Sequence, residues 1–152
     1  MSVLPAQIIR ERNLVYPCRE KYKLRGVSGG LSIASYDVAI DQPILFGPRQ
    51  FKLASTVERF NMPLDVCGMV HDKSTWARIG LTVQTTFIDP GWCGFLTLEI
   101  SNNTDNEIEV HMGMPIAQIV FHQMLEEPEG GGYSGKYQDQ KQGPQEPIME
   151  DE

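Results

Sequence analysis

Cysteine is scarce in this sequence, and the three thiols, at Cys18, Cys67 and Cys93, lie far apart along the chain. No Cys-x-x-Cys pair or Cys/His cluster is present, so we expect neither a structural zinc site nor a disulfide framework. The three histidines show no His-x-Glu or His-Glu-x-x-His spacing, which argues against a zinc enzyme. These absences favour a reduced compartment, and we expect the protein to be cytoplasmic.

Long hydrophobic runs and excess positive charge are also missing. No apolar stretch approaches the roughly 18 residues of a membrane span, and the N-terminal "MSVLPAQIIRERNLV" lacks the apolar core of a signal peptide. Thirteen Lys and Arg against 20 Asp and Glu give a net charge of -7. We therefore expect no membrane and no nucleic-acid polymer as partner. A small anionic ligand is compatible with this balance, because it needs only a few local cations.

The chain does contain a succession of short strand patterns separated by turn signals. "CGFLTLEISN" (93–102) alternates apolar and polar residues, and "DPGW" (89–92) has the Pro and Gly positions of a type II turn. Two further strands are predicted within 107–124, split at Gly113-Met114-Pro115. There is no βαβ rhythm, P-loop or Gly-x-Gly-x-x-Gly motif. This pattern predicts an all-β barrel or sandwich.

Other elements follow from local composition. We expect a short N-terminal helix within 4–15, one docked helical turn at 73–78, and a flexible Gly-, Gln- and Pro-rich tail at 128–152 after a domain of residues 1–127. Further strands are expected to end near residues 56 and 70. We also expect a loop at 19–30, a strand at 31–41 and a second continuous strand at 80–88.

Glu99 stands in the middle of the apolar strand "FLTLEIS", on the same face as Thr97. A buried carboxylate is unfavourable unless something compensates it, so Glu99 is a candidate for chemistry. The alternative is an ordinary solvent-facing glutamate on a half-exposed strand, and patterning alone favours that alternative.

The segment "KSTWAR" brings Ser74 and Arg78 to the same face of a helical turn, while Trp76 points away as an anchor. Asp72 is a candidate N-cap. A hydroxyl, a guanidinium and backbone N–H groups together suit an anion such as phosphate. A structural turn with an Arg–carboxylate pair explains the same residues equally well. Asp89, which opens "DPGW", is a common turn residue in its own right.

Several segments occur in an order that resembles a known family. They are "SGG…ASYDVAID", "FKLASTVERFNMPLDV", "KSTWARIGLTV", "FIDPGWCGFLTLEISN", "MGMPIAQIVF" and "YSGKYQDQ…GP". Together, over about residues 4–144, they are similar to the dCTP deaminase branch of the dUTPase superfamily. The resemblance implies a distorted, jelly-roll-like β-barrel of the dUTPase type that forms a homotrimer with active sites at subunit interfaces. It also implies deamination without zinc, with Mg²⁺ bound through the triphosphate of dCTP or dUTP.

The resemblance also implies roles for individual residues. The implied catalytic residues are Glu99, Arg78 and Ser74. The implied substrate-binding residues are Lys73 near the phosphates, Thr75, Asp89 at the sugar, Gln84, Thr85, and the tail residues Tyr133, Lys136 and Gln140.

The chain departs from the family in "VQTTFIDPG", where Gln84 replaces a histidine and about two residues are missing after Thr86. This hairpin grips the base and sugar in the family, so the departure bears on base choice. We expect deamination of dCTP to dUTP, with continuation to dUMP and pyrophosphate as a close variant. The alternative is a diphosphatase that acts on dUTP, or on another pyrimidine deoxynucleoside triphosphate, without deamination. A non-catalytic nucleotide-binding homologue is a third hypothesis, disfavoured by the presence of Ser74, Arg78, Asp89 and Glu99.

Overall fold

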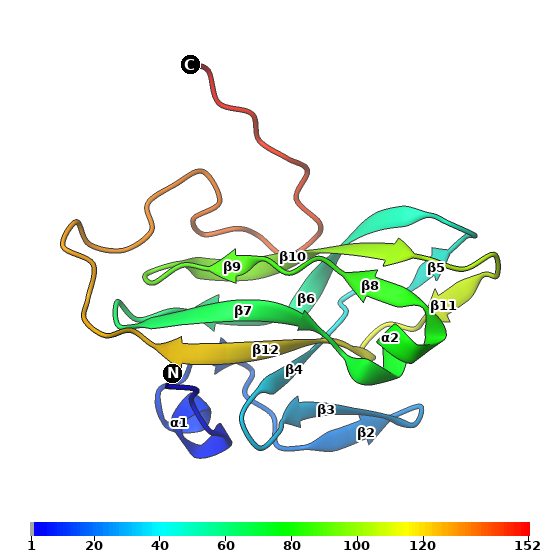
Figure 1. The fold of residues 1–152 in the computed structure, drawn as a ribbon, viewed down its shortest axis with the longest axis horizontal. Coiled ribbons are helices and arrows are strands. Elements are labelled where there is room, and N and C mark those ends of the chain that lie inside the picture. The colour runs from blue at the N-terminus through cyan, green and yellow to red at the C-terminus, as the bar shows by residue number, and fades with distance from the viewer. Residues whose placement is uncertain (1) are drawn as a thin grey trace.

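Antiparallel β-sheets build almost the whole molecule (Figure 1). The computed structural model describes residues 2–152. The helices are α1 (Ala6–Glu11) and α2 (Ser74–Ile79). The strands are β1 (Val15–Tyr16), β2 (Tyr22–Leu24), β3 (Val27–Leu31), β4 (Tyr36–Ala39), β5 (Ile44–Phe46), β6 (Phe51–Asn61), β7 (Val66–Asp72), β8 (Leu81–Val83), β9 (Phe87–Ile88), β10 (Cys93–Asn102), β11 (Ile108–Val110) and β12 (Pro115–Gln123). No helix in this described part is long and apolar enough to cross a membrane.

Two curled sheets enclose a single apolar core. One has the strand order β1-β6-β10-β8 and the other β2-β3-β4-β12-β7-β9, while β11 and β5 form a small third sheet. Figure 1 shows β10 and β8 lying above β7 and β12, with the chain end rising beyond them. Side chains from both larger sheets, among them Phe60, Leu98 and Phe121, are fully buried between them. The all-β expectation is confirmed.

The locally encoded elements lie where the sequence predicts them. The N-terminal helix is present as α1, the docked turn as α2, and "CGFLTLEISN" as the whole of β10. In "DPGW", Gly91 has φ 83° and the N–H of Trp92 donates to the carbonyl of Asp89 at 3.1 Å, as in a type II turn. The strands near residues 56 and 70 both extend further than expected, to Asn61 and Asp72.

The expected loop at 19–30 is wrong, because β2 and β3 form a hairpin there. Arg25 and Gly26 make its two-residue turn with φ of 49° and 82°, the combination that joins two twisted strands tightly. The strand expected at 31–41 is also wrong as a single element. Leu31 ends β3, the N–H of Ser32 bonds the carbonyl of Ser35, and β4 then pairs back against β3.

The strand expected at 80–88 is interrupted. Its first part, β8, pairs with β10, whereas its second part, β9, pairs with β7 in the other sheet. Residues 84–86 carry the chain between the two sheets, so the β-branched run is shared by both. This crossing places β9 and the following turn beside β10, where the candidate site lies.

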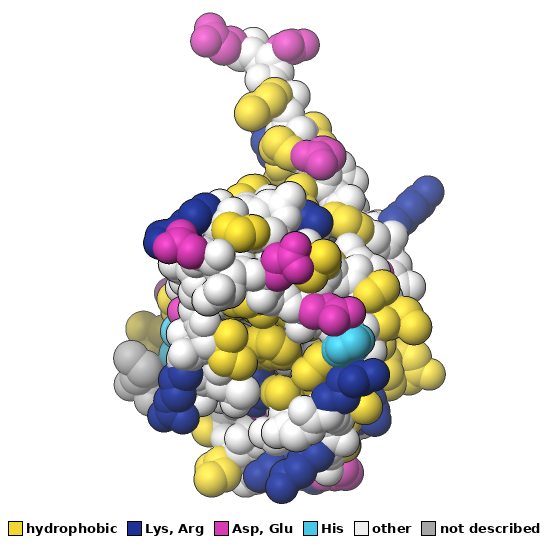
Figure 2. All heavy atoms as spheres, turned by 90° about the vertical axis from the view of Figure 1, so that its right-hand side faces the viewer, with side chains coloured by type: hydrophobic (Ala, Val, Ile, Leu, Met, Phe, Trp, Pro, Cys, Tyr) yellow, Lys and Arg dark blue, Asp and Glu magenta, His cyan; other side chains and the backbone are white. Residues whose placement is uncertain are grey.

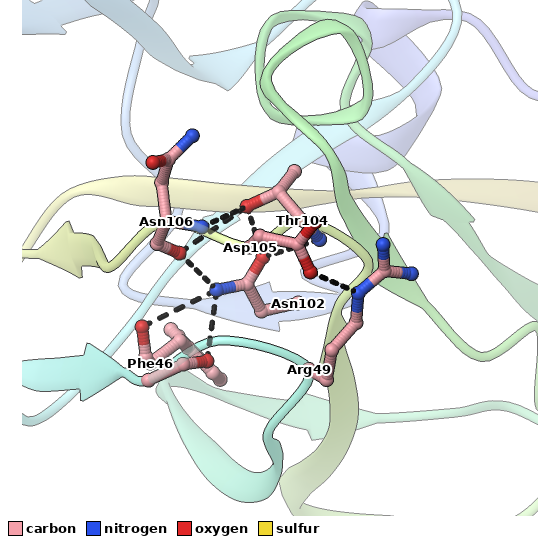
Figure 3. A network of polar contacts seen from close by, with 7 residues as sticks. Phe46, Arg49, Asn102, Thr104, Asp105 and Asn106 are labelled. Carbon is pink, nitrogen blue, oxygen red and sulfur yellow. Dashed lines mark hydrogen bonds and ion pairs between the residues drawn. The ribbon is translucent and has the colours of Figure 1, made fainter.

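The C-terminal end of β10 is held by the side chain of Asn102, which is buried (Figure 3). Its nitrogen donates to three carbonyl oxygens, those of Phe46, Gly47 and Asn106, at 3.3, 2.9 and 2.8 Å. Its oxygen accepts from the backbone N–H and the hydroxyl of Thr104 at 2.9 and 2.8 Å. One amide thus ties the turn before β6 to the turn after β10 and fixes the strand that carries Glu99.

A buried carboxylate, Glu58, lies where the pairing of β6 with β10 changes register, between Phe95 and Thr97. Its side chain has no solvent exposure, and Oε2 accepts the N–H of Ala39 at 3.0 Å. The Tyr36 hydroxyl lies 3.5 Å from Oε1. Burial raises the pKa of Glu58 to about 7, against the partial compensation of these hydrogen bonds.

Replacing Glu58 with Gln should change how stability depends on pH. The folded-state pKa lies above the unfolded value, so ionisation of Glu58 lowers the free energy of unfolding as pH rises from about 4.5 to about 7. Glu58→Gln keeps the acceptor for Ala39 and never ionises. We expect its stability relative to wild type to rise by about 2–3 kcal/mol between pH 5 and pH 8. Denaturant titrations at fixed protein concentration measure this difference, and an equal difference at both pH values would contradict it.

Candidate functional site

A cavity of about 890 Å³ lies between β6, β9, β10 and the C-terminal segment. This size is within the range of sites for small molecules. Its walls combine aromatic and aliphatic side chains with a few polar groups. The lining residues are Phe51, Lys52, Leu53, Phe87, Ile88, Asp89, Trp92, Leu96, Thr97, Glu99, Tyr133, Tyr137, Gln140, Pro144, Gln145, Glu146 and Pro147.

Glu99 points into this cavity from the middle of β10. The strand alternates strictly, and the neighbouring Leu98 and Ile100 are fully buried on its other face. Glu99 itself is half-buried, and its Oε2 is buried with no hydrogen-bond partner within residues 2–152. Burial raises the pKa of Glu99 above its ordinary value, and a hydrogen bond from its own backbone only partly offsets this. The carboxyl group therefore has a partly desolvated environment, unlike that of a freely solvated surface glutamate.

Asp89 reaches the same cavity from the turn between β9 and β10. That turn also approaches the C-terminal segment closely. A Cβ on Gly91 would lie 2.7 Å from the Cα of Gly132, and the N–H of Tyr133 donates to the carbonyl of Pro90 at 2.7 Å. Gly91 is thus required both by its positive φ and by the packing of the tail.

The C-terminal segment, drawn in orange to red in Figure 1, forms one side of the cavity. The indole N–H of Trp92 donates to the carbonyl of Tyr137 at 2.7 Å. The N–H of Asp139 donates to the carbonyl of Cys93 at 2.9 Å. These bonds hold the tail against the start of β10.

The structure separates the three tail residues of the sequence prediction. Tyr133 and Gln140 line the cavity, whereas Lys136 is exposed and lines a second, smaller hollow formed by the tail alone. The side-chain amide of Gln140 donates to the carbonyl of Phe95 at 2.7 Å and to the hydroxyl oxygen of Thr97 at 3.0 Å. In this structure Gln140 therefore binds the protein's own strand.

Ser74, Thr75 and Arg78 are exposed on α2 and are not among the residues that line the cavity. In Figure 1, α2 lies at the end of the molecule away from the tail. Trp76 is buried as predicted, and its indole N–H donates to the carbonyl of Pro115 at 2.6 Å. Within one chain, the Ser74 hydroxyl and the Arg78 guanidinium are therefore not part of the cavity that Glu99 lines.

The predicted capping role of Asp72 is wrong. Lys73 occupies the N-cap position of α2, and no side chain of residues 2–152 caps the helix there. The carboxylate of Asp72 instead accepts the N–H of Val83 at 2.6 Å. This bond joins the end of β7 to the end of β8, a contact between segments that local sequence does not reveal.

Lys73 is buried, and its Nζ lies 2.8 Å from Oδ2 of Asp37 in β4. Burial raises the pKa of Asp37, although the hydrogen bond from Lys73 opposes that shift. Oδ1 of Asp37 has no partner among the residues that the structure describes. The charge of Lys73 is therefore engaged in a buried ion pair at the start of α2.

Gln84 and Thr85 are exposed in the crossing segment between β8 and β9. The backbone N–H of Gln84 donates to the carbonyl of Glu99 at 2.9 Å. The shortened segment is therefore attached directly to the strand residue that carries the buried carboxylate, although neither side chain lines the cavity of this single chain.

Sequence reasoning missed several cavity residues. Thr97 had a visible signal, since it shares the face of Glu99 two residues away. Phe51 and Phe87 line the cavity and are about half exposed, at 55% and 54%. Strand aromatics are usually core residues, so their sequence positions alone could not assign them to a cavity.

Among residues 2–152, no group of three or more His, Cys, Asp or Glu side chains is placed to hold a metal ion. The carboxylates that line the cavity, Asp89, Glu99 and Glu146, come from three different segments.

Comparison with known proteins relates this chain to a protein family. The model of the family described as "dCTP deaminase-like" matches residues 23–124. The dCTP deaminase of Thermococcus sibiricus is 36% identical over 90% of this chain and 91% of its own length. The dUMP-forming dCTP deaminase of Leifsonia xyli subsp. xyli is 40% identical over 69% of this chain, but only 55% of its own length is matched.

Solved structures agree with the fold. A substituted dUTPase from phage phi11 of S. aureus superposes with a TM-score of 0.59 at 18% identity, covering 76% of this chain and 90% of that one. That structure is described as coordinating a structural Mg(II) ion. The expected dUTPase-type β-fold is confirmed.

Substitution of Lys73 tests its buried pairing. Lys73→Met leaves Asp37 buried without its partner, so we expect unfolding to become easier by about 3–5 kcal/mol. Arg78→Met, on the exposed face of the same helix, is the matched control and should change stability by less than about 0.5 kcal/mol. Denaturation of both variants at neutral pH measures the contrast. Equal stabilities would show that the ion pair contributes nothing to the fold.

Proposed function

This chain belongs to the dCTP deaminase-like family, and we propose that it catalyses the hydrolytic deamination of dCTP to dUTP. One observation carries the proposal. Glu99 lines a cavity of suitable size with a carboxyl group whose pKa is raised and whose Oε2 has no hydrogen-bond partner among the described residues. A proton-transfer group works best when its pKa is close to the working pH, and burial moves Glu99 in that direction.

In the proposed reaction, water adds to C4 of the cytosine ring and ammonia leaves, so dCTP and water give dUTP and ammonia. Glu99 takes a proton from the attacking water and returns a proton to the departing amino group. The apolar walls around it, including Phe87, Leu96 and Trp92, limit access of bulk water. Asp89 at the cavity rim is assigned to the sugar, and the tail to closure over the nucleotide.

The proposed active site is shared between copies of the chain in a homotrimer. Ser74 and Arg78 do not line the cavity of Glu99 in one chain, so we assign them to the site of a neighbouring copy. Ser74 would then hold the water and Arg78 would stabilise negative charge. Figure 2 looks onto the end of the molecule that carries α2 and shows exposed hydrophobic side chains across it. Leu45 and Ile79, each 49% exposed, are apolar groups that subunit contact would cover.

Triphosphate recognition completes the proposal. Mg²⁺ bound to the nucleotide would neutralise phosphate charge, because this ion prefers phosphate oxygens and water to all-protein cages. Two carboxylates at the cavity, Asp89 and Glu146, fit such indirect contact better than direct ligation. Thr75 and Lys136 are assigned to the phosphates. Lys73 contributes through its ion pair, which fixes the start of α2.

The base end of the site is assigned to Gln84 and Thr85, next to Glu99. Continuation to dUMP and pyrophosphate is the second candidate outcome. It is favoured by the dUMP-forming relatives, such as that of Leifsonia xyli subsp. xyli. In that case the same bound nucleotide undergoes water attack at the α-phosphate, with Asp89 positioning the water.

A product assay tests the proposal directly. Incubation with dCTP and Mg²⁺ should yield dUTP or dUMP together with ammonia, resolved by chromatography. Glu99→Gln should lower this turnover by about 10²–10⁴-fold, because the proton-transfer group is removed while shape and assembly are kept. Release of dCMP without any deoxyuridine product would refute deamination. Turnover of dUTP alone would establish the diphosphatase alternative.

Subunit mixing tests the shared site. Arg78→Met and Glu99→Gln homotrimers should each be nearly inactive. Co-expressed, the two variants should recover up to about a quarter of wild-type activity, since random mixing places both native residues in one site out of four. Sizing the mixture by light scattering confirms the trimer. Mixed trimers no more active than the separate variants would show that Arg78 and Glu99 act within one chain or not together.

A further inference from the structure

The hydroxyl of Thr97 is the point where the tail meets the catalytic face of β10. Its oxygen accepts two hydrogen bonds, one from the side-chain amide of Gln140 and one from the backbone N–H of Gln145, each at 3.0 Å. A threonine oxygen has two acceptor positions, and the tail fills both. The two donors come from opposite ends of one short loop of the tail.

Upstream of this loop the tail is already attached to the backbone of β10. Gly94 and Gln140 form a parallel bridge, and the N–H of Phe95 donates to the carbonyl of Gln140 at 3.0 Å. This pairing stops at Gln140. Beyond it, the N–H of Gly143 donates to the hydroxyl of Ser55 at 3.0 Å. The hydroxyl oxygen of Thr97 accepts the N–H of Gln145. Two side-chain hydroxyls on neighbouring strands therefore direct the course of the loop.

The end of this loop and the residue after it form the cavity wall near Glu99. Pro144, Gln145 and Glu146 line the same cavity as Glu99. Thr97 and Glu99 are two residues apart on one face of β10, so the atom that holds this wall is adjacent to the carboxylate. The position of the wall therefore affects the surroundings of Glu99, because the wall is bonded to Thr97 on the same face of β10.

We propose that Thr97 is a positioning residue, a latch whose hydroxyl holds the tail loop of residues 140–145 closed beside Glu99. Its effect on turnover rests on the proposed deaminase function, whereas its effect on the tail does not. The backbone pairing at Cys93–Phe95 keeps the tail attached, and the Thr97 latch decides the position of the loop beyond it.

Limited trypsin digestion tests the latch without substrate. Lys141 is an exposed cleavage site inside the loop. Thr97→Val keeps the shape of the side chain but removes both acceptor positions, so cleavage after Lys141 should become at least about tenfold faster, in proportion to the opened population. Thr97→Ser keeps the hydroxyl and should retain wild-type protection. Ser101→Ala, a hydroxyl loss on the same face away from the tail contacts, is the matched control.

A second pair of variants tests the same contact from the tail side. Gln145→Pro removes the N–H that Thr97 accepts, whereas Gln145→Ala keeps it. Only the proline variant should accelerate cleavage. Because these changes lie on the exposed tail, they give an answer even if Thr97→Val fails to fold.

Kinetics with dCTP and Mg²⁺ complete the test. Thr97→Val should lower kcat about tenfold, and Thr97→Ser should restore it, because the wall closes only when the hydroxyl is present. Equal cleavage in Thr97→Val and wild type, or in both Gln145 variants, would overturn the latch. Equal kcat in Thr97→Val and wild type would overturn its link to Glu99. If wild type itself does not deaminate dCTP, the proposed function fails while the digestion result still decides the latch.

Discussion

The register of β10 is the constraint on which the candidate site depends. Leu98 and Ile100 are fully buried in the apolar core, and this fixes which face of the strand points inward. Thr97 and Glu99 must then face the cavity. A slip of one residue would bury the carboxylate in the core and expose Leu98 and Ile100. Asn102 secures this register at one end of the strand by bonding two neighbouring turns.

The other end of β10 is where the tail attaches. The tail bonds the backbone of Cys93 and Phe95 as well as the indole of Trp92. The same strand therefore contributes side chains to the core, lines the cavity and binds the tail along its edge. Because Glu99 belongs to this strand, the local environment of its carboxyl group depends on contacts made by residues more than thirty positions later in the chain. In the proposed enzyme, long-range bonds of this kind would couple closure of the tail to the chemistry at Glu99 without any additional domain.

The position of α2 explains why Ser74 and Arg78 do not line the cavity of Glu99 in one chain. Trp76 anchors the helix in the core, and the Lys73–Asp37 pair fixes its start, so α2 is held firmly at the end of the molecule away from the tail. A rigid, exposed helix with a serine and an arginine on one face is well suited to complete the site of a neighbouring copy. In the proposed trimer, each chain therefore supplies Glu99 to its own cavity and the Ser74 and Arg78 side chains to the cavity of a neighbouring copy.

Local signals were enough to predict β10, the "DPGW" turn, α2 with its buried tryptophan, and the all-β class, because alternation, turn residues and helical spacing act over a few neighbouring residues. The candidate residues came from a resemblance in motif order, and only some of them line one cavity in this chain. The partner of Lys73, the bond of Asp72 to Val83, and the split of 80–88 between two sheets depended on strand pairing across the fold. Residues far apart in the chain meet only after the sheets curl, so the tertiary structure alone decided the surroundings of Glu99 and its contact with the tail through Thr97.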